Sequence, residues 1–301
     1  MIILRLEGGL GNLMFQYALG RHLALKNQME LKFDIGSYQT NPLGDCSFWL
    51  EGFGIDIKTN LATQNEIQRF KKYDRRPGGK WFLYNWLMAS PSKYVREKGF
   101  AFDPMVLEIK GSFYLHGWFQ TEKYFKDIRE IILKDFTVQR HPLDKNKEVA
   151  KKIATTHSIG IHIRRADYVA NPKTRYYHGE LPRAYYDNAL VIITTKIPRP
   201  TLFIFSDDIE WVKHNMRFPF ETVYTGWNAM EAAHEDVRLM SLCKHNIISN
   251  STLGWWGAWL NKNNDKIVVA PSKWFANSPK CDTKDIVPEN WHTVEPCFIT
   301  K

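Results

Sequence analysis

The residues best suited to chemistry stand in one basic segment, His162-Ile163-Arg164-Arg165-Ala166-Asp167-Tyr168, at the end of the apolar run 158–163. Two guanidinium groups suit a diphosphate, because each is permanently charged and presents a planar fork of donors to phosphate oxygens. An isolated Arg-Arg pair is more often a solvated basic turn. Its position after a strand favours an anion site here, since parallel sheets bind ligands at the carboxyl ends of their strands.

A second polar segment, Ser206-Asp207-Asp208, follows the apolar run 201–205. One of its two carboxylates is expected to cap the next helix, because Asp is favoured at the N-cap and complements the helix dipole. The other is then free to accept hydrogen bonds from a ribose or a base. Paired carboxylates can also bind a divalent metal. The chain contains no Asp-x-Asp, so we expect no metal and assign the positive charge to Arg164 and Arg165.

A third polar segment, Ser249-Asn250-Ser251-Thr252, stands directly before an aromatic helix expected at 253–261. Hydroxyls and free amides at a helix N-terminus form an anion site, and the same hydroxyls are expected to cap the helix. Trp256, Trp259 and Leu260 have the spacing of one helix face. Most of this aromatic surface is therefore predicted to be core, with one Trp at most in contact with a ligand.

A glycine-rich loop follows the first apolar run of the chain. Gly9 and Gly11, with Asp34 at the end of the next apolar run, match part of a dinucleotide-binding fingerprint. Met14 occupies the position of the third glycine, so the pattern is incomplete. We expect the glycines to bring the backbone and Asn12 close to a ligand in a cleft between two domains.

An alternation of strands and helices positions these segments. Beyond residue 150, strands are expected at 158–163, 201–205, 221–224, 246–249 and 266–270, and helices at 183–194, 209–215, 235–244 and 253–261. This order predicts an α/β fold with a parallel, doubly wound sheet. The first half opens with a βαβ unit from strand 2–6 to strand 30–34. Further strands are expected at 55–59 and 112–119, and helices at 64–72 and 126–133. The polar stretch 139–152 places the boundary between domains 1–150 and 151–301.

Composition limits the partners of this 301-residue chain. The 41 Lys and Arg against 32 Asp and Glu give a net charge of +9, which favours nucleic acid, an acidic membrane surface or a phosphorylated small molecule. The 4 cysteines include no C-x-x-C pair, so neither a metal site nor a disulfide framework is indicated. No signal peptide or membrane span is predicted. We expect a cytoplasmic protein with at most peripheral contact to anionic lipid.

Several segments, taken in order, resemble the bacterial α-1,2-fucosyltransferases over nearly the whole chain. They are Gly8–Asn12 with Met14–Ala18, Gly117–Gln120 with Lys123–Phe125, His162–Tyr168, Ser206–Asp208 and Ser249–Leu260. The resemblance implies transfer of L-fucose from GDP-fucose to the 2-hydroxyl of a galactoside, with inversion and without a required metal. It also implies a GT-B fold of two Rossmann-like domains facing a cleft. The N-terminal domain would be the acceptor side, and the C-terminal domain would bind GDP-fucose. A lactose-like sugar or a glycan terminus would be the acceptor.

The resemblance also implies roles for single residues. Arg164 would bind the β-phosphate and His162 would lie beside the nucleotide. Related inverting fucosyltransferases have an acid at a fixed distance before a phosphate-binding hydroxyl, which aligns Asp236 with Thr252 and suggests Asp236 for the guanine. The remaining donor-site candidates are Arg165, Ser206, Asp207, Asp208, Asn250, Ser251, Gly9 and Asn12. Leu13 and Trp118 depart from the Gln and Tyr usual in the family, which bears on acceptor preference.

The acceptor hydroxyl must lose a proton, and a carboxylate is the usual base. Asp167 is one candidate, but it could instead orient Arg164 through an ion pair. Glu7 and Glu122 lie near the acceptor-side motifs and are further candidates.

Two other function classes have weaker support from the sequence. The incomplete glycine pattern opposes an NAD-dependent oxidoreductase, and the scattering of Lys and Arg opposes a nucleic-acid-binding protein.

Overall fold

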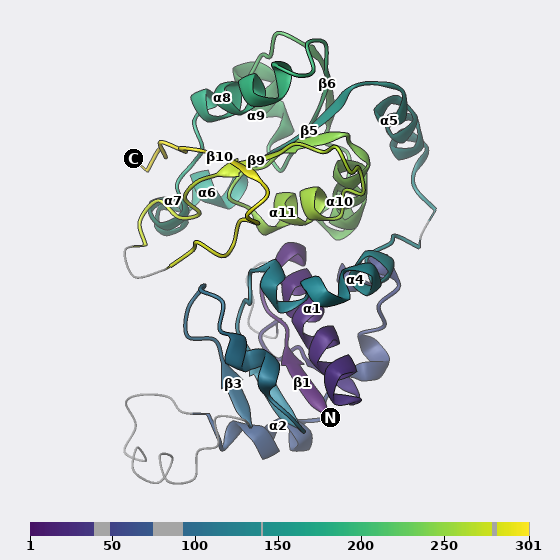
Figure 1. The fold of residues 1–301 in the computed structure, drawn as a ribbon, viewed down its shortest axis with the longest axis vertical. Helices are drawn as coiled ribbons and strands as arrows, with labels where there is room; N and C mark the ends of the chain where they lie inside the picture. Colours follow the sequence, from purple (N-terminus) through teal and green to yellow (C-terminus); the bar gives the residue numbers. More distant parts are fainter. Residues whose placement is uncertain (39–48, 75–92, 140, 279–281, 301) are drawn as a thin grey trace. The chain divides into compact units, whose positions relative to one another are not determined.

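The computed structural model describes residues 1–38, 49–74, 93–139, 141–278 and 282–300 (Figure 1). The chain divides into two compact units, Met1–Phe136 and Thr137–Lys301. Each unit contains a sheet whose paired strands all run parallel, which confirms the predicted α/β class. The expected boundary after residue 150 falls within helix α5 (Asp144–Thr155), which packs on α10 (Ala233–Leu242) of the second unit.

The sheet of unit 1 has the order β2-β1-β4-β3. Its strands are β1 (Ile2–Arg5), β2 (Leu31–Asp34), β3 (Tyr94–Arg96) and β4 (Phe113–His116). Side chains alternate across it: Leu4 packs against Gly20 of α1 (Leu10–Asn27), whereas Ile3 packs against Ile67 of α2 (Gln64–Lys71). The chain runs from β1 to β2 at one edge of the sheet, crosses to β3 at the other edge and returns to β4. Strands β1 and β4 are therefore neighbours at the centre of the sheet.

The helices of unit 1 agree in part with the sequence. They are α1 (Leu10–Asn27), η2 (Trp49–Phe53), η3 (Lys58–Asn60), α2 (Gln64–Lys71), η4 (Pro104–Glu108), η5 (Glu122–Tyr124), η6 (Lys126–Ile128) and α4 (Arg129–Asp135). The expected strand at 55–59 is wrong. The Asp56 carboxylate accepts a hydrogen bond from the Thr59 N–H at 3.0 Å, and such a local bond favours a turn over a strand ladder.

The sheet of unit 2 has the order β10-β9-β8-β5-β6-β7. Its strands are β5 (Ser158–Ile163), β6 (Thr201–Ser206), β7 (Glu221–Thr225), β8 (His245–Ile247), β9 (Val268–Pro271) and β10 (His292–Val294). Counted along the chain, this is the strand order of the Rossmann fold, which confirms the predicted doubly wound sheet. The short edge strand β10 was missed, because its three residues are not buried and carry no apolar run.

Helices cover both faces of the unit 2 sheet (Figure 1). They are α6 (Ala166–Ala170), α7 (Pro172–His178), α8 (Arg183–Thr194), α9 (Ile209–Asn215), η7 (Met230–Ala232), α10 and α11 (Thr252–Trp259). Ile159, Ile161 and Ile163 of β5 pack into the core with α8 and α9. The alternate residue His162 faces α11, where it lies against Gly254.

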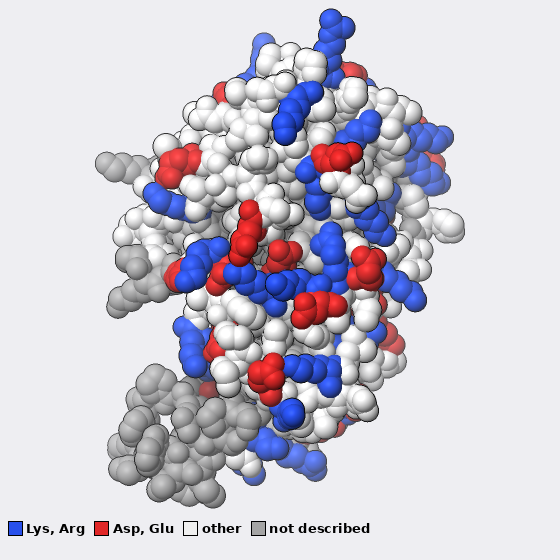
Figure 2. Space-filling view, viewed as in Figure 1, with Lys and Arg blue, Asp and Glu red and all other residues white. Residues whose placement is uncertain are grey.

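Charged side chains of both signs are interspersed on the face in Figure 2. Elsewhere in the described residues, charged side chains form ion pairs, such as Lys26 with Glu108 and Lys152 with Glu221. On the face in Figure 2, positive charge is therefore interrupted by acidic side chains. A bilayer crossing needs about 20 apolar residues, and the helices in the described part of the chain offer no such stretch.

Candidate active site

The candidate site of unit 2 lies at the carboxyl ends of β5 and β8. These neighbouring strands continue toward opposite edges of the sheet, an arrangement that opens a ligand crevice in doubly wound folds. His162 Nδ1 and Ser249 Oγ meet here at 2.8 Å. A Cβ on Gly254 would lie 2.8 Å from the His162 ring, so the glycine makes room for it. Burial and the nearby Arg164 charge lower the pKa of His162 to about 3, and the ring is neutral at pH 7.

Arg164 follows β5 and is fixed by two carboxylates. Its Nη2 lies 2.6 Å from Asp167 Oδ1, and its Nη1 lies 2.8 Å from Asp207 Oδ2. Burial lowers the pKa of Arg164, but Asp207 and Asp167 raise it more, and the net shift is upward. A guanidinium has five N–H donors, so donors remain for an anion, and the side chain is 30% exposed.

Arg165 points elsewhere, although the sequence suggests that it joins Arg164 at a diphosphate. Its side chain is only 7% exposed and pairs with Glu180. Its Nε lies 3.2 Å from Asp208 Oδ2, and its guanidinium lies 3.2 Å from the centre of the Trp211 ring. Neither Glu180 nor Trp211 carries a sequence signal, since nothing local links them to the arginine.

The segment after β6 supports both arginines. Asp207 Oδ1 accepts the Arg165 backbone N–H at 2.8 Å, and the Ser206 hydroxyl accepts the Asp208 N–H at 3.1 Å. Asp208 stands at the N-cap of α9 but makes no side-chain bond to its first turn. The expected carboxylate cap is therefore wrong, because the arginines after β5 engage both acids.

The segment after β8 leads into α11. Ser251 at the N-cap makes no side-chain hydrogen bond to the helix, so the expected hydroxyl cap is also wrong. The chain enters the helix through a tight turn, in which the Ser251 N–H donates to the Ser249 carbonyl at 2.8 Å. Asn250 is used structurally, because its Nδ2 donates to the His178 and Trp274 carbonyls at 2.9 and 3.1 Å. The α11 tryptophans are buried, as predicted: Trp255, Trp256 and Trp259.

Tyr168 and His178 connect these segments, and no sequence pattern points to His178. Their rings stack with centroids 4.5 Å apart. The Tyr168 hydroxyl donates to the Asn250 carbonyl at 3.0 Å. Burial lowers the pKa of His178 to about 4. The two rings therefore brace the helical turn that carries Asp167 against the segment after β8.

Asp236 lies on α10, which packs against α11. The two helices thus carry Asp236 and Thr252, the pair aligned by the resemblance. Asp236 Oδ1 accepts a hydrogen bond from Asn228 Nδ2 at 2.7 Å. Burial raises the pKa of Asp236 to about 7, although the Asn228 bond lowers it. Its neighbour Glu235 is bound by Arg238 and Asn146.

Gly9 and Asn12 lie in unit 1, at the start of α1. The Asn12 N–H donates to the Gly9 carbonyl at 2.9 Å, and Asn12 Oδ1 accepts from Gln120 Nε2 at 2.9 Å. The preceding Gly8 has φ +85°, where a side chain would be strained, and a Cβ there would lie 2.9 Å from the Trp118 ring. The loop after β1 therefore packs against the loop after β4.

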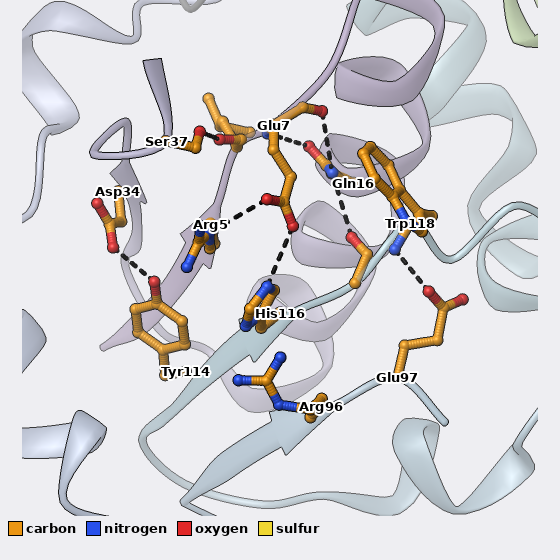
Figure 3. Close-up of polar contacts among 12 residues, drawn as sticks. Arg5, Glu7, Gln16, Asp34, Ser37, Arg96, Glu97, Tyr114, His116 and Trp118 are labelled. Carbon is orange, nitrogen blue, oxygen red and sulfur yellow. Dashed lines mark hydrogen bonds and ion pairs between the residues drawn. The ribbon is translucent and has the colours of Figure 1, made fainter. Parts of the chain in front are cut away.

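Glu7, in the loop after β1, contacts His116, the last residue of β4 (Figure 3). Glu7 Oε1 lies 3.1 Å from His116 Nε2, and Glu7 Oε2 lies 3.3 Å from Arg5 Nε. The other ring nitrogen of His116 lies 2.9 Å from the Tyr94 hydroxyl. Burial raises the pKa of Glu7, but the His116 hydrogen bond and the Arg5 charge lower it more. The carboxylate is therefore ionised at neutral pH.

Glu97, at the end of β3, holds the loop after β4. Its carboxylate accepts the backbone N–H groups of Trp118 and Phe119 at 2.6 and 2.8 Å (Figure 3). A Cβ on Gly117 would lie 2.3 Å from the Glu97 Cβ, so glycine permits the approach. Burial raises the pKa of Glu97 to about 7, although both backbone bonds lower it.

Metal ligands do not gather in the described ranges. Across them, no three His, Cys, Asp or Glu side chains come together as a metal ion requires. The acids beside the two arginines are already paired with guanidinium groups: Asp167, Asp207, Asp208 and Glu180.

Comparison with known proteins relates the whole chain to glycosyltransferases. A family model described as glycosyl transferase family 11 matches residues 3–295. An α-1,2-colitosyltransferase of Escherichia coli is 32% identical over 303 residues, covering 98% of this chain and 99% of the relative. The O-antigen biosynthesis glycosyltransferase WbnK of Escherichia coli is 34% identical, covering 91% of this chain and 95% of the relative.

More distant similarity reaches animals and plants. The galactoside 2-α-L-fucosyltransferase SEC1 of Bos taurus is 25% identical, covering 61% of this chain and 48% of the relative. Among solved structures, a mutant of FUT1 from Arabidopsis thaliana in complex with GDP has 13% identity and a TM-score of 0.49. It covers 99% of this chain and 75% of that chain.

The two adjacent arginines should differ in their effect on stability. Arg165→Met removes the close partner of buried Glu180 and leaves it only the longer contact with Arg175 at 3.9 Å, and we expect the free energy of unfolding to fall by about 3 kcal/mol. Arg164→Met removes a more exposed group, and we expect a loss of about 1 kcal/mol or less. Urea denaturation of both variants measures the difference. Equal losses would contradict the buried role of Arg165.

Proposed function

This chain belongs to glycosyl transferase family 11, and we propose that it transfers L-fucose from GDP-fucose to the 2-hydroxyl of a terminal β-galactoside. The product would be an α-1,2-linked glycan or oligosaccharide, formed with inversion. The observation that carries the proposal is the fixed Arg164 guanidinium at the switch point of unit 2, with donors left for a phosphate. The name of the bovine relative, a galactoside 2-α-L-fucosyltransferase, supports the donor and the linkage.

In this proposal Arg164 assists departure of the nucleotide. Inverting transfer requires the acceptor hydroxyl to attack the anomeric carbon opposite the leaving GDP, so negative charge grows on the diphosphate. Cations and oriented N–H groups stabilise such charge in the transition state. Arg164 supplies the cation, and the α11 N-terminus supplies the Ser251 hydroxyl and the N–H groups that begin at Thr252. No metal is required, and GDP-fucose acts as a co-substrate.

The remaining donor residues take supporting roles. Asp167 and Asp207 orient Arg164 through their ion pairs, and Arg165 with Asp208 fixes the backbone that carries it. Neutral His162 lies at the same edge and offers a ring nitrogen to the nucleotide. Asp236 would accept hydrogen bonds from the guanine. The other candidates, on the same loops or at the start of α1, would complete the pocket: Ser206, Asn250, Gly9 and Asn12.

The arrangement would be that of a GT-B enzyme. Unit 2 would bind GDP-fucose and unit 1 the galactoside, across a cleft between the two Rossmann-like domains. In this proposal the enzyme is cytoplasmic, with at most peripheral contact to the inner membrane. Nucleic acid is not a partner in this proposal.

A second donor is favoured by the α-1,2-colitosyltransferase relative. Colitose is L-fucose without its 3-hydroxyl, so the two donors share the nucleotide, the diphosphate and the linkage. The alternative function is therefore α-1,2-colitosyl transfer by the same mechanism.

Donor and acceptor can be tested together. Purified protein is incubated with GDP-fucose or GDP-colitose and a panel of lactose, N-acetyllactosamine and type 1 galactosides, and the linkage of each product is determined by NMR. We expect an α-1,2-fucosylated galactoside. Transfer from GDP-colitose alone would replace the first proposal with the second. If the protein neither hydrolyses either donor nor transfers a sugar from it, both proposals are contradicted.

Arg164→Ala should abolish most transfer while the protein stays folded. Loss of a transition-state cation costs about two orders of magnitude or more in kcat/KM. Arg183→Ala is the matched control, because Arg183 pairs with Asp187 at 2.7 Å on the surface of α8. Turnover of GDP-fucose by Arg164→Ala close to that of the control would disprove the role.

Asp167→Asn should distinguish a base from an orienting group. The 2.6 Å ion pair with Arg164 supports orientation. We therefore expect kcat to fall about tenfold at all pH values, with the shape of the pH–rate profile unchanged. If the acidic limb of the profile disappears in the variant, Asp167 is the base instead.

A further inference from the structure

We infer that unit 1 binds the acceptor sugar at the carboxyl ends of β1 and β4, with Trp118 stacking on the sugar ring and Glu7 accepting hydrogen bonds from its hydroxyls. The inference rests on the proposed function for the identity of the reaction. It goes further in naming the residues that contact the acceptor and the residue that positions them.

Topology locates the site. In the order β2-β1-β4-β3, β1 and β4 are neighbours at the centre of the sheet, and ligands of parallel sheets bind outside the carboxyl ends of the strands. Glu7 follows β1 by two residues, and Trp118 follows β4 by two residues. The two side chains thus follow the two central strands, and both are labelled in Figure 3.

Glu7 provides the polar half of the site. Its carboxylate is held by His116 and Arg5, yet 20% of the side chain remains exposed. A carboxylate offers about four acceptor positions, so lone pairs remain after these two contacts. The Gln16 amide fixes the loop itself, because its Nε2 donates to the Glu7 and Gly117 carbonyls at 3.3 and 3.2 Å. A rigid, ionised acceptor of this kind suits the hydroxyls of a sugar.

Trp118 provides the apolar half. The side chain is partly exposed, and its ring packs against Gly8, where a Cβ would approach it to 2.9 Å. Galactosides present a patch of C–H groups on one ring face, which an aromatic ring covers well while polar groups bind the rim. The ring and the Glu7 carboxylate therefore form the two kinds of surface that a pyranose needs.

Glu97 is the positioning residue of this site. It binds the backbone N–H groups of Trp118 and Phe119, and it holds Phe119 at φ +52°, which side chains rarely adopt. Its carboxylate is thus used on the backbone rather than on a ligand. Loss of this clamp should displace Trp118 without removing any sugar-contacting group.

Steady-state kinetics with GDP-fucose and lactose test the three residues. We expect Trp118→Ala and Glu7→Gln each to raise the KM for lactose about tenfold, since each removes a contact of the order of 1.4 kcal/mol. The KM for GDP-fucose and the slow hydrolysis of GDP-fucose without acceptor should stay within about twofold. Glu97→Gln should raise the KM for lactose in the same way, whereas a merely structural defect would lower kcat and both affinities together.

Glu108→Gln is the matched control. Glu108 pairs on the surface with Lys26, near the C-terminus of α1 and therefore at the opposite end of the sheet from the site. We expect it to leave both KM values unchanged. An unchanged KM for lactose in Trp118→Ala and in Glu7→Gln would overturn the inference.

A binding measurement separates this inference from the proposed function. Saturation-transfer NMR with methyl β-galactoside and no donor should detect contact with the wild-type protein and lose most of it in Trp118→Ala. This result would support the sugar site even if GDP-fucose proved not to be the donor. Equal saturation transfer in both proteins would reject the site while leaving fucosyl transfer intact.

Discussion

The Asp207 carboxylate joins the ends of two parallel strands, and the geometry of the unit 2 site depends on this contact. One oxygen binds the Arg165 backbone N–H and the other the Arg164 guanidinium. The turn after β5 is thereby tied to the turn after β6. Because the same carboxylate fixes a backbone and a side chain, Arg164 stays at the exposed edge while Arg165 enters the core beside Glu180.

The ion pairs around the two arginines show that the net positive charge of the chain does not make this site a basic patch. The chain carries a net charge of +9, yet four carboxylates surround the two arginines at the site, so this part of unit 2 is not a positive patch. An anion would be selected by the direction of the remaining N–H donors rather than by bulk attraction. Oriented charge of this kind contributes to specificity more than to raw affinity.

Local patterns predicted much of this structure. Helices α8 and α9 lie where the apolar spacing placed them, and the polar segments follow their strands because strand ends are marked by the end of an apolar run. Contacts between distant residues escaped prediction. The expected Asp208 cap is absent because Arg165, which follows another strand, binds the carboxylate. Glu97 carried no sequence signal because its partners are backbone N–H groups.

The two residues that depart from the family pattern, Leu13 and Trp118, have different structural roles. Leu13 is fully buried within α1, so an apolar residue there serves packing in the core of unit 1. Trp118 is partly exposed on a loop held by Glu97 at the carboxyl end of β4. A substitution can change ligand preference directly only where its side chain reaches the ligand. Acceptor preference should therefore follow the residue at position 118, and position 13 should affect stability.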